Sequence, residues 1–134
     1  MSGKDADLGA RLDAELTAHN LATSGSRDQA EFTVRIDDDA GDLVAGLSGW
    51  TWGTCAGISL VWVRQDRRAQ GAGARLLAAA ERVARERGCR QIVVSSFTFQ
   101  APGFYERHGF VETGRTEGLP IEGAADVHLV KRLR

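Results

Sequence analysis

The residues best suited to chemistry lie between Leu60 and Leu77, where an apolar, β-branched run passes through two glycines into an Ala- and Arg-rich segment. This pattern predicts a strand, a tight turn through Gly71 and Gly73, and the start of a helix. The first turn of a helix has backbone N–H groups without internal partners and a positive dipole end, so it binds anions. Glycines let a phosphate approach the backbone, and Arg67 and Arg68 can add charge-assisted hydrogen bonds. The stretch therefore predicts a pyrophosphate site.

The kind of pyrophosphate ligand is narrowed by what the turn lacks. A P-loop needs Gly-Lys-Ser/Thr, and Gly71 to Ala74 contains neither lysine nor a hydroxyl, which disfavours ATP and GTP. A Rossmann fingerprint needs a third glycine, where this chain has Leu76, and an acid about 20 residues on, where it reads Arg90-Gln91-Ile92. A dinucleotide-binding fragment is a weaker alternative, and failure to bind NAD would remove it.

Two segments resemble one known family. Arg68-Ala69-Gln70-Gly71-Ala72-Gly73 resembles the Arg/Gln-x-x-Gly-x-Gly/Ala segment of the GCN5-related N-acetyltransferases (GNAT), which holds the pyrophosphate of acetyl-CoA. The run from Ala101 to Phe110 resembles the family's Ala-x-x-Phe-Tyr-Glu-x-x-Gly-Phe segment. The chain is therefore identified as similar to a small single-domain bacterial member, with the resemblance strongest from Ile58 to Phe110. An ordinary Gly-rich helix start followed by an aromatic core helix is the alternative.

The resemblance implies roles for individual residues. Tyr105 matches the tyrosine that protonates the departing CoA sulfur, and Trp62 and Val63 are expected beside the thioester, where a backbone N–H polarises its carbonyl. Thr98 occupies the position of a family asparagine that holds the cofactor arm, and Gln100 can share that task. The residues expected to bind acetyl-CoA are Trp62, Val63, Arg68, Ala69, Gln70, Gly71, Ala72, Gly73, Ala74, Thr98, Gln100 and Phe104.

The acceptor site is less well marked. Leu43 to Gln65 contains no Asp or Glu, so a carboxylate base on the central strand is absent. The base is then a water relay or one of five side chains, or it is unnecessary because the amine is weakly basic. The five candidate side chains are His19, His108, Glu122, Asp126 and His128. The candidate acceptor-site residues are His19, Trp50, Trp52, Phe97, Asp126 and His128. Aromatic walls with an acid suit a cationic or planar amine, although core packing is the alternative for both tryptophans.

The function these signals favour is transfer of an acetyl group from acetyl-CoA to a primary amine of a small metabolite or antibiotic-like molecule, by direct attack in a ternary complex. A protein or peptide N-acetyltransferase is one alternative. A non-catalytic acetyl-CoA-binding module is another, although binding alone would not need the general acid Tyr105.

Composition sets the wider limits. The 134 residues suit a single domain over 1–134, and 43% hydrophobic and 26% charged residues are typical of a soluble globular protein. The net charge of -1 gives no general attraction to nucleic acid, and no apolar run is long enough to span a membrane. No signal peptide precedes Asp7, and Cys55 and Cys89 lack metal-ligand spacing, so a cytoplasmic, metal-free protein is expected. A homodimer remains open.

The elements that must position these residues follow from periodicity. Leu8, Leu12 and Leu16 recur every four residues, which predicts an amphipathic first helix. The resemblance implies an α/β (α+β) GNAT fold with a mixed, mostly antiparallel sheet, a V-shaped splay between its two central parallel strands, and flanking helices. Expected helices are 6–20, 71–87 and 101–108; expected strands are 31–37, 43–52, 55–64, 91–97, 110–113 and 126–131; expected loops include 21–28 and 114–123.

Overall fold

The computed structural model describes residues 3–25 and 29–134. Its elements in chain order are α1 (Ala6–Ser24), β1 (Ala30–Asp37), β2 (Leu43–Trp52), β3 (Cys55–Val63), the 3₁₀ turn η1 (Gln65–Arg67), α2 (Ala72–Glu86), β4 (Gln91–Phe97), α3 (Pro102–Arg107), β5 (Val111–Glu117) and β6 (Ala125–Arg132). None of the helices in the described part of the chain has the length and apolar character needed to cross a membrane.

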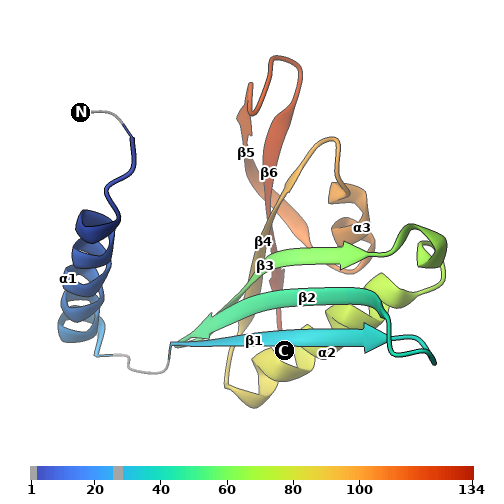
Figure 1. Cartoon of the computed structure of the whole chain (residues 1–134), viewed down its shortest axis with the longest axis horizontal. Coiled ribbons are helices and arrows are strands. Elements are labelled where there is room, and N and C mark those ends of the chain that lie inside the picture. The colour runs from blue at the N-terminus through green and yellow to red at the C-terminus, as the bar shows by residue number, and fades with distance from the viewer. Residues whose placement is uncertain (1–2, 26–28) are drawn as a thin grey trace.

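The six strands form one mixed sheet in the order β1-β2-β3-β4-β6-β5, and every neighbouring pair is antiparallel except β3 and β4. The parallel pair is short, because it runs only from Cys55 opposite Gln91 to Gly57 opposite Val93. Beyond this point the two strands diverge, so that β1 to β3 turn away from β4 to β6 (Figure 1). The predicted V-shaped splay between the central parallel strands is confirmed.

A β-bulge lies in β3 where the splay opens. Gly49 of β2 pairs with Ile58 and Ser48 pairs with Leu60, so Ser59 is an extra residue on the β3 side. A bulge bends its strand and re-aims the side chains that follow it. Leu60 and Trp62 are exposed after the bulge, whereas Ala56 and Ile58 before it are buried.

One face of the sheet is covered and carries the core. The helix α2 buries an apolar stripe on it, as its 3.6-residue periodicity predicts, while its arginines face solvent. The fully or nearly buried residues of this core include Ala45, Leu47, Ala56, Leu76, Ala80, Ala84, Ile92, Val127 and Leu129. Burial of a side chain such as Leu76 contributes about 1.5–3 kcal/mol. We call this side the covered face.

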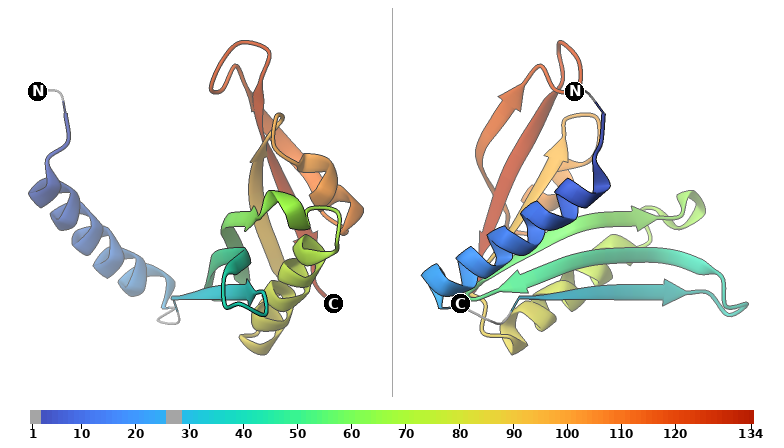
Figure 2. Two further views of the ribbon diagram at one scale, coloured as in Figure 1. Left: turned by 45° about the vertical axis from the view of Figure 1, so that its right-hand side comes forward. Right: turned by 60° about the vertical axis from the view of Figure 1, so that its left-hand side comes forward.

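We call the opposite side of the sheet the open face. Among the described residues, no helix packs on it. The helix α1 stands apart from the sheet and buries none of its residues (Figure 2). Its leucines are 52%, 58% and 59% exposed at Leu8, Leu12 and Leu16. A helix with three exposed leucines and a sheet face without a helix on it are therefore both present, but they do not meet within one chain.

Several boundaries differ from those expected from sequence. The strand β5 continues to Glu117, so the loop predicted from Gly114 is wrong up to that residue. The strand β5 lies at the edge of the sheet and is exposed to solvent. Its charged residues therefore have the sequence pattern of a loop. The helix α1 extends to Ser24 and ends at Gly25 with φ 72°, so the loop predicted from residue 21 begins later, and its positions 26–28 lie outside the described residues.

Candidate active site

The turn between β3 and α2 presents its backbone amides outward. Gly71 precedes α2 with φ 84°, and no side chain caps the helix start. The N–H groups from Gly71 to Ala74 donate to no acceptor in residues 3–25 and 29–134. The adjacent Ala69 has φ 67°, which an L-residue adopts only at a cost. The turn therefore has the uncapped amides and the positive helix end that a phosphate group requires.

Arg64 holds the segment that leads from β3 into this turn through ion pairs with two aspartates. The Arg64 guanidinium forms a bidentate pair with Asp66, with Nε 2.6 Å from Oδ1 and Nη2 3.2 Å from Oδ2. Its Nη1 lies 3.3 Å from Oδ2 of Asp38 in the β1–β2 turn. Hydrogen bonds from Arg64 lower the pKa of Asp66, and the pKa of Asp38 is lowered first by the Asp42 amide and then by Arg64.

Arg68 and Gln70, both expected to bind cofactor, also brace the turn. Arg68 Nε donates to the carbonyl of Val63 at 3.2 Å, and Gln70 Nε2 donates to the carbonyl of Asp66 at 3.3 Å.

The two sequence motifs meet at Gly73 and Phe104. A Cβ atom on Gly73 would lie 2.9 Å from Cζ of the Phe104 ring, so only glycine permits this approach. The contact sets α3 beside the start of α2, although the two residues are 31 positions apart. Phe104 also stacks edge-on against Tyr105, with ring centroids 5.3 Å apart.

Tyr105 is held by packing rather than by hydrogen bonds. The residue is 7% exposed, and its ring also contacts Phe110 edge-on at 5.5 Å. Its hydroxyl makes no hydrogen bond with the described residues, and no fully enclosed side-chain N or O among them lacks a partner. The hydroxyl oxygen is therefore not fully enclosed, although the residue as a whole is buried. Burial raises the pKa of the Tyr105 phenol, so the proton is retained at neutral pH.

The end of β4 is closed by Thr98 and Gln100. The Thr98 hydroxyl accepts from the Ala125 amide at 3.1 Å, and Gln100 Oε1 accepts from the Phe97 amide at 2.9 Å. Each side chain accepts one backbone hydrogen bond through its oxygen. The Thr98 hydroxyl hydrogen and the Gln100 amide hydrogens are therefore left to donate to a ligand.

Polar and aromatic side chains line the open face beside the splay. His128 on β6 lies between two hydroxyls, with Nδ1 3.0 Å from Ser95 Oγ and Nε2 3.3 Å from Thr116 Oγ1. Asp126 is on the same face of β6, opposite Phe97. The Phe97 ring stacks on Phe99 with centroids 5.3 Å apart and planes 3° apart.

Not all of the expected acceptor residues come together in one chain. Trp50 and Trp52 share the open face, but they lie at the paired end of the V, near Cys55. His19 is on the detached α1, with Nε2 3.5 Å from Thr23 Oγ1. Two base candidates have other surroundings: His108 Nδ1 lies 2.9 Å from the Phe104 carbonyl, and Glu122 is exposed in the β5–β6 loop.

Ser95 and Thr116 were not singled out from sequence. The strand alternation that puts Asp126 and His128 on one face also assigns Ser95 to it, once β4 and β6 are known to pair. Thr116 lay in the stretch interpreted as a loop, so no sequence signal pointed to it.

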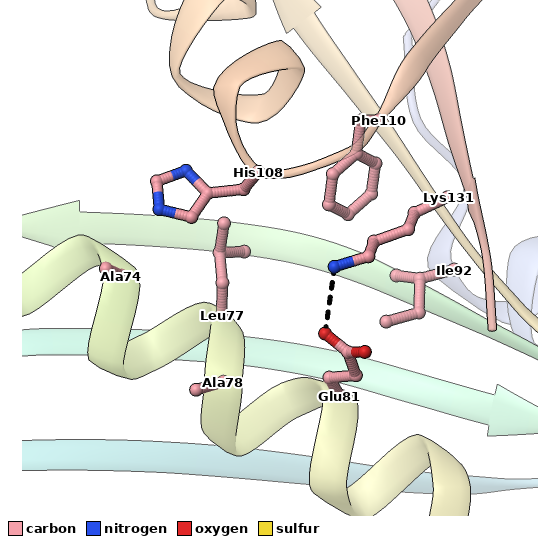
Figure 3. A pocket seen from close by; sticks show the side chains of 8 residues that line it. All are labelled: Ala74, Leu77, Ala78, Glu81, Ile92, His108, Phe110 and Lys131. Carbon is pink, nitrogen blue, oxygen red and sulfur yellow. Dashed lines mark hydrogen bonds and ion pairs between the residues drawn. The ribbon is translucent and has the colours of Figure 1, made fainter. Parts of the chain in front are cut away.

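A hollow lies on the covered face, between α2 and the end of α3 (Figure 3). It measures about 100 Å³ and is bounded by the ion pair between Lys131 Nζ and Glu81 Oε2, 3.0 Å apart. Burial opposes ionisation of Glu81, but hydrogen bonds from Arg85 and Lys131 outweigh it and lower the carboxyl pKa. Since these charges are paired within the protein, the hollow offers none to a ligand.

Comparison with known proteins agrees with this geometry. The model of the acetyltransferase (GNAT) family matches residues 6–110. The acetyltransferase Atu2258 of Agrobacterium fabrum is 34% identical over 110 residues, which cover 82% of this chain and 80% of the relative. The blasticidin-S acetyltransferase of Streptomyces morookaense is 43% identical over 76 residues, or 54% of each protein. The chain therefore belongs to the GNAT acetyltransferase family.

Solved structures share the whole architecture. An acetyltransferase of Bacillus cereus superposes with a TM-score of 0.88 at 29% identity, covering 99% of this chain and 96% of that one. An Agrobacterium tumefaciens protein assigned to the acetyltransferases superposes with a TM-score of 0.89 at 31% identity, with the same coverages. Both alignments extend over α1, because they cover 99% of this chain.

A more distant structure of the same fold carries the cofactor. A Bacillus anthracis protein assigned as a streptothricin acetyltransferase was solved in complex with acetyl coenzyme A. It superposes with a TM-score of 0.69 at 22% identity, over 78% of this chain and 63% of that one.

Proposed function

We propose that this protein transfers an acetyl group from acetyl-CoA to a primary amine of a small molecule, by direct attack in a ternary complex. The observation that carries the proposal is the contact between Gly73 and Phe104. This contact holds α3, which carries Tyr105, beside the start of α2, and so supports one site made of the uncapped amides and the Tyr105 hydroxyl. A site that only bound the cofactor would need the uncapped amides but not the Tyr105 hydroxyl.

The cofactor would lie along the opening between β3 and β4. Its pyrophosphate fits the amides from Gly71 to Ala74 with the Arg68 guanidinium, and Thr98 and Gln100 can donate to the pantetheine arm. A backbone N–H near Trp62 and Val63 would polarise the thioester carbonyl. Trp62 is 47% exposed, so its side chain is available to cover the bound arm.

The chain's residues account for the proton transfers. The amine nitrogen attacks the thioester carbonyl carbon, a C–N bond forms, and the C–S bond breaks. The amine proton passes to a base, for which His128 is the best placed candidate because its two ring nitrogens contact hydroxyls that hold its orientation. The departing CoA sulfur takes its proton from the Tyr105 hydroxyl, which burial keeps protonated at neutral pH.

The surroundings of the splay favour a small cationic or planar acceptor. Phe97 and Phe99 form a stacked aromatic surface, and Phe99 is 64% exposed. The Asp126 carboxylate lies opposite Phe97 and has no hydrogen bond within the described residues. Stacking and cation–π contacts with one unpaired acid recognise a protonated, planar amine. The 43% identity to a blasticidin-S acetyltransferase supports the same class of acceptor.

The test is acceptor-dependent release of CoA thiol from acetyl-CoA. The panel holds blasticidin S, streptothricin- and aminoglycoside-type amines, small polyamines and short peptides, assayed with wild type, Tyr105→Phe and Asp126→Asn. We expect release with a small amine, a fall in kcat of about 10²–10⁴-fold in Tyr105→Phe, and a raised KM in Asp126→Asn. Preference for peptides would instead favour the protein N-acetyltransferase. Tight acetyl-CoA binding without release from any acceptor would favour a cofactor-binding module.

A further inference from the structure

The helix α1 and the open face of the sheet are two apolar surfaces without partners. Leu8, Leu12 and Leu16 form one stripe because residues four apart lie on the same side of a helix, and all three are more than half exposed. A monomeric protein rarely leaves a contiguous apolar patch of this kind in water.

The open face carries a matching apolar row across five of its six strands. By the strand register, Trp50 is opposite Gly57, Gly57 opposite Val93, Val93 opposite Val130, and Val130 opposite Val111. The Trp50 indole lies on Gly57, where an added Cβ atom would be 2.2 Å from the ring, so the row is flat at this point. Val111 at the β5 end is 66% exposed. The row is long enough to receive a helix.

A space separates α1 from its own sheet. Asp13 and Thr17 of α1 face Trp50 and Trp52 across a cleft of about 340 Å³, and no α1 residue is buried. In Figure 2 the helix runs along the open face without resting on it. Alignments with two related crystal structures cover 99% of this chain, so both extend over α1.

We propose that two copies of this chain exchange their α1 helices. The α1 leucines of each copy pack on the row of Trp50, Gly57, Val93, Val130 and Val111 of the other. Every copy has one exposed helix stripe and one bare sheet face, so a two-fold axis satisfies both with the same contact made twice. A different protein would leave one of the two surfaces uncovered in each copy.

The experiment is the mass of the full chain in solution by light scattering, with three variants. We expect wild type at twice the single-chain mass of 14.4 kDa. Leu12→Asp places a charge in the helix stripe, and Val111→Glu places one in the sheet row. Each change occurs twice in a two-fold interface, so each should raise the dissociation constant at least about 100-fold.

Ala14→Asp is the matched control. It lies two residues from both Leu12 and Leu16, which turns it about 200° from either, to the far side of the helix. We expect it to remain a dimer. Circular dichroism verifies that the variants are folded, and since Leu12 is exposed in the single chain its replacement leaves the core intact.

Cross-linking identifies which chain supplies the helix. A photo-crosslinking residue at Leu12, in an equal mixture of ¹⁵N-labelled and unlabelled chains, should join α1 peptides to β4 or β6 peptides of the other isotope. A single-chain mass for wild type overturns the proposal. So does a dimer that survives both Leu12→Asp and Val111→Glu, or cross-links confined to one isotope. None of these outcomes depends on catalysis, so they are independent of the proposed acetyl transfer.

Discussion

The indole of Trp50 lies against the backbone of Gly57 on the neighbouring strand, where a Cβ atom would come within 2.2 Å of the ring. The two residues are direct partners in the β2–β3 ladder. This contact lays the indole directly on the β3 backbone. Gly57 belongs to the last segment in which β3 still pairs with β4 before the two strands diverge. The contact explains why a central strand tolerates a glycine, which costs conformational entropy and provides no side-chain contact.

Gly57→Ala should therefore destabilise the fold. The rigid indole cannot yield without leaving its place, and overpacking of this kind typically costs about 1–3 kcal/mol. Chemical denaturation with the tryptophan signal measures the change. Gly46→Ala is the matched control on β2, because its nearest neighbour is the Val34 carbonyl at an ordinary 3.7 Å. Equal losses in the two variants would contradict this explanation.

The pH profile of acetyl transfer should reflect the environment of Tyr105. Burial raises the phenol pKa above its usual value near 10, so Tyr105, the proposed general acid, keeps its proton throughout the neutral and mildly alkaline range. We expect no fall in kcat from loss of this proton until the pH exceeds about 10. Stopped assays from neutral to alkaline pH, with Tyr105→Phe for comparison, measure this limb. A decline near pH 8 that disappears in the variant would contradict it.

Arg64 should contribute stability that disappears in acid. It lowers the carboxyl pKa values of Asp66 and, after the Asp42 amide, of Asp38. A pKa lowered by folding stabilises the protein above the unfolded value near 4, and this contribution is lost as the pH falls through the folded value. The difference in Tm between wild type and Arg64→Gln should thus be largest at neutral pH and shrink below about pH 4.

The control for this series is Arg11→Gln, which removes an exposed pair with Glu15 on α1. Exposed ion pairs of this kind contribute about 0–1 kcal/mol to the free energy of unfolding. The Tm of Arg11→Gln should therefore follow that of wild type at every pH. A pH-independent difference for Arg64→Gln would mean that the arginine acts through packing and not through the two carboxyls.

Ala69→Gly should stabilise the protein even though it removes a methyl group. Ala69 has φ 67°, and the left-handed region costs an L-residue roughly 1–2 kcal/mol, whereas glycine adopts it freely. After the entropy that glycine loses on folding, a net gain of about 0.5–1 kcal/mol is expected. Thermal unfolding measures it. Ala72→Gly, three residues on and buried at the start of α2, should lose stability instead.

Much of the site could be predicted because its parts are local. The strand, glycine turn and helix around Gly71 follow from backbone chemistry, and Tyr105 from the motif that contains it. The limits of β2 and β4 agree with their predicted residues, since apolar alternation over a buried strand is a strong signal. The open edge strand β5 was taken for a loop after Thr113, because its pairing with β6 is a long-range property that its charged residues do not reveal.

The sequence by itself pointed to the residues proposed to hold a pyrophosphate and donate a proton, since amide geometry, glycine freedom and the motif around Tyr105 belong to short segments. Only the tertiary structure decided that Gly73 touches Phe104, that Ser95 and Thr116 contact His128, and that α1 leaves the sheet uncovered. Periodicity shows that a helix has an apolar side. What that side packs against depends on contacts between residues distant in the chain, or between two chains, which no local pattern records.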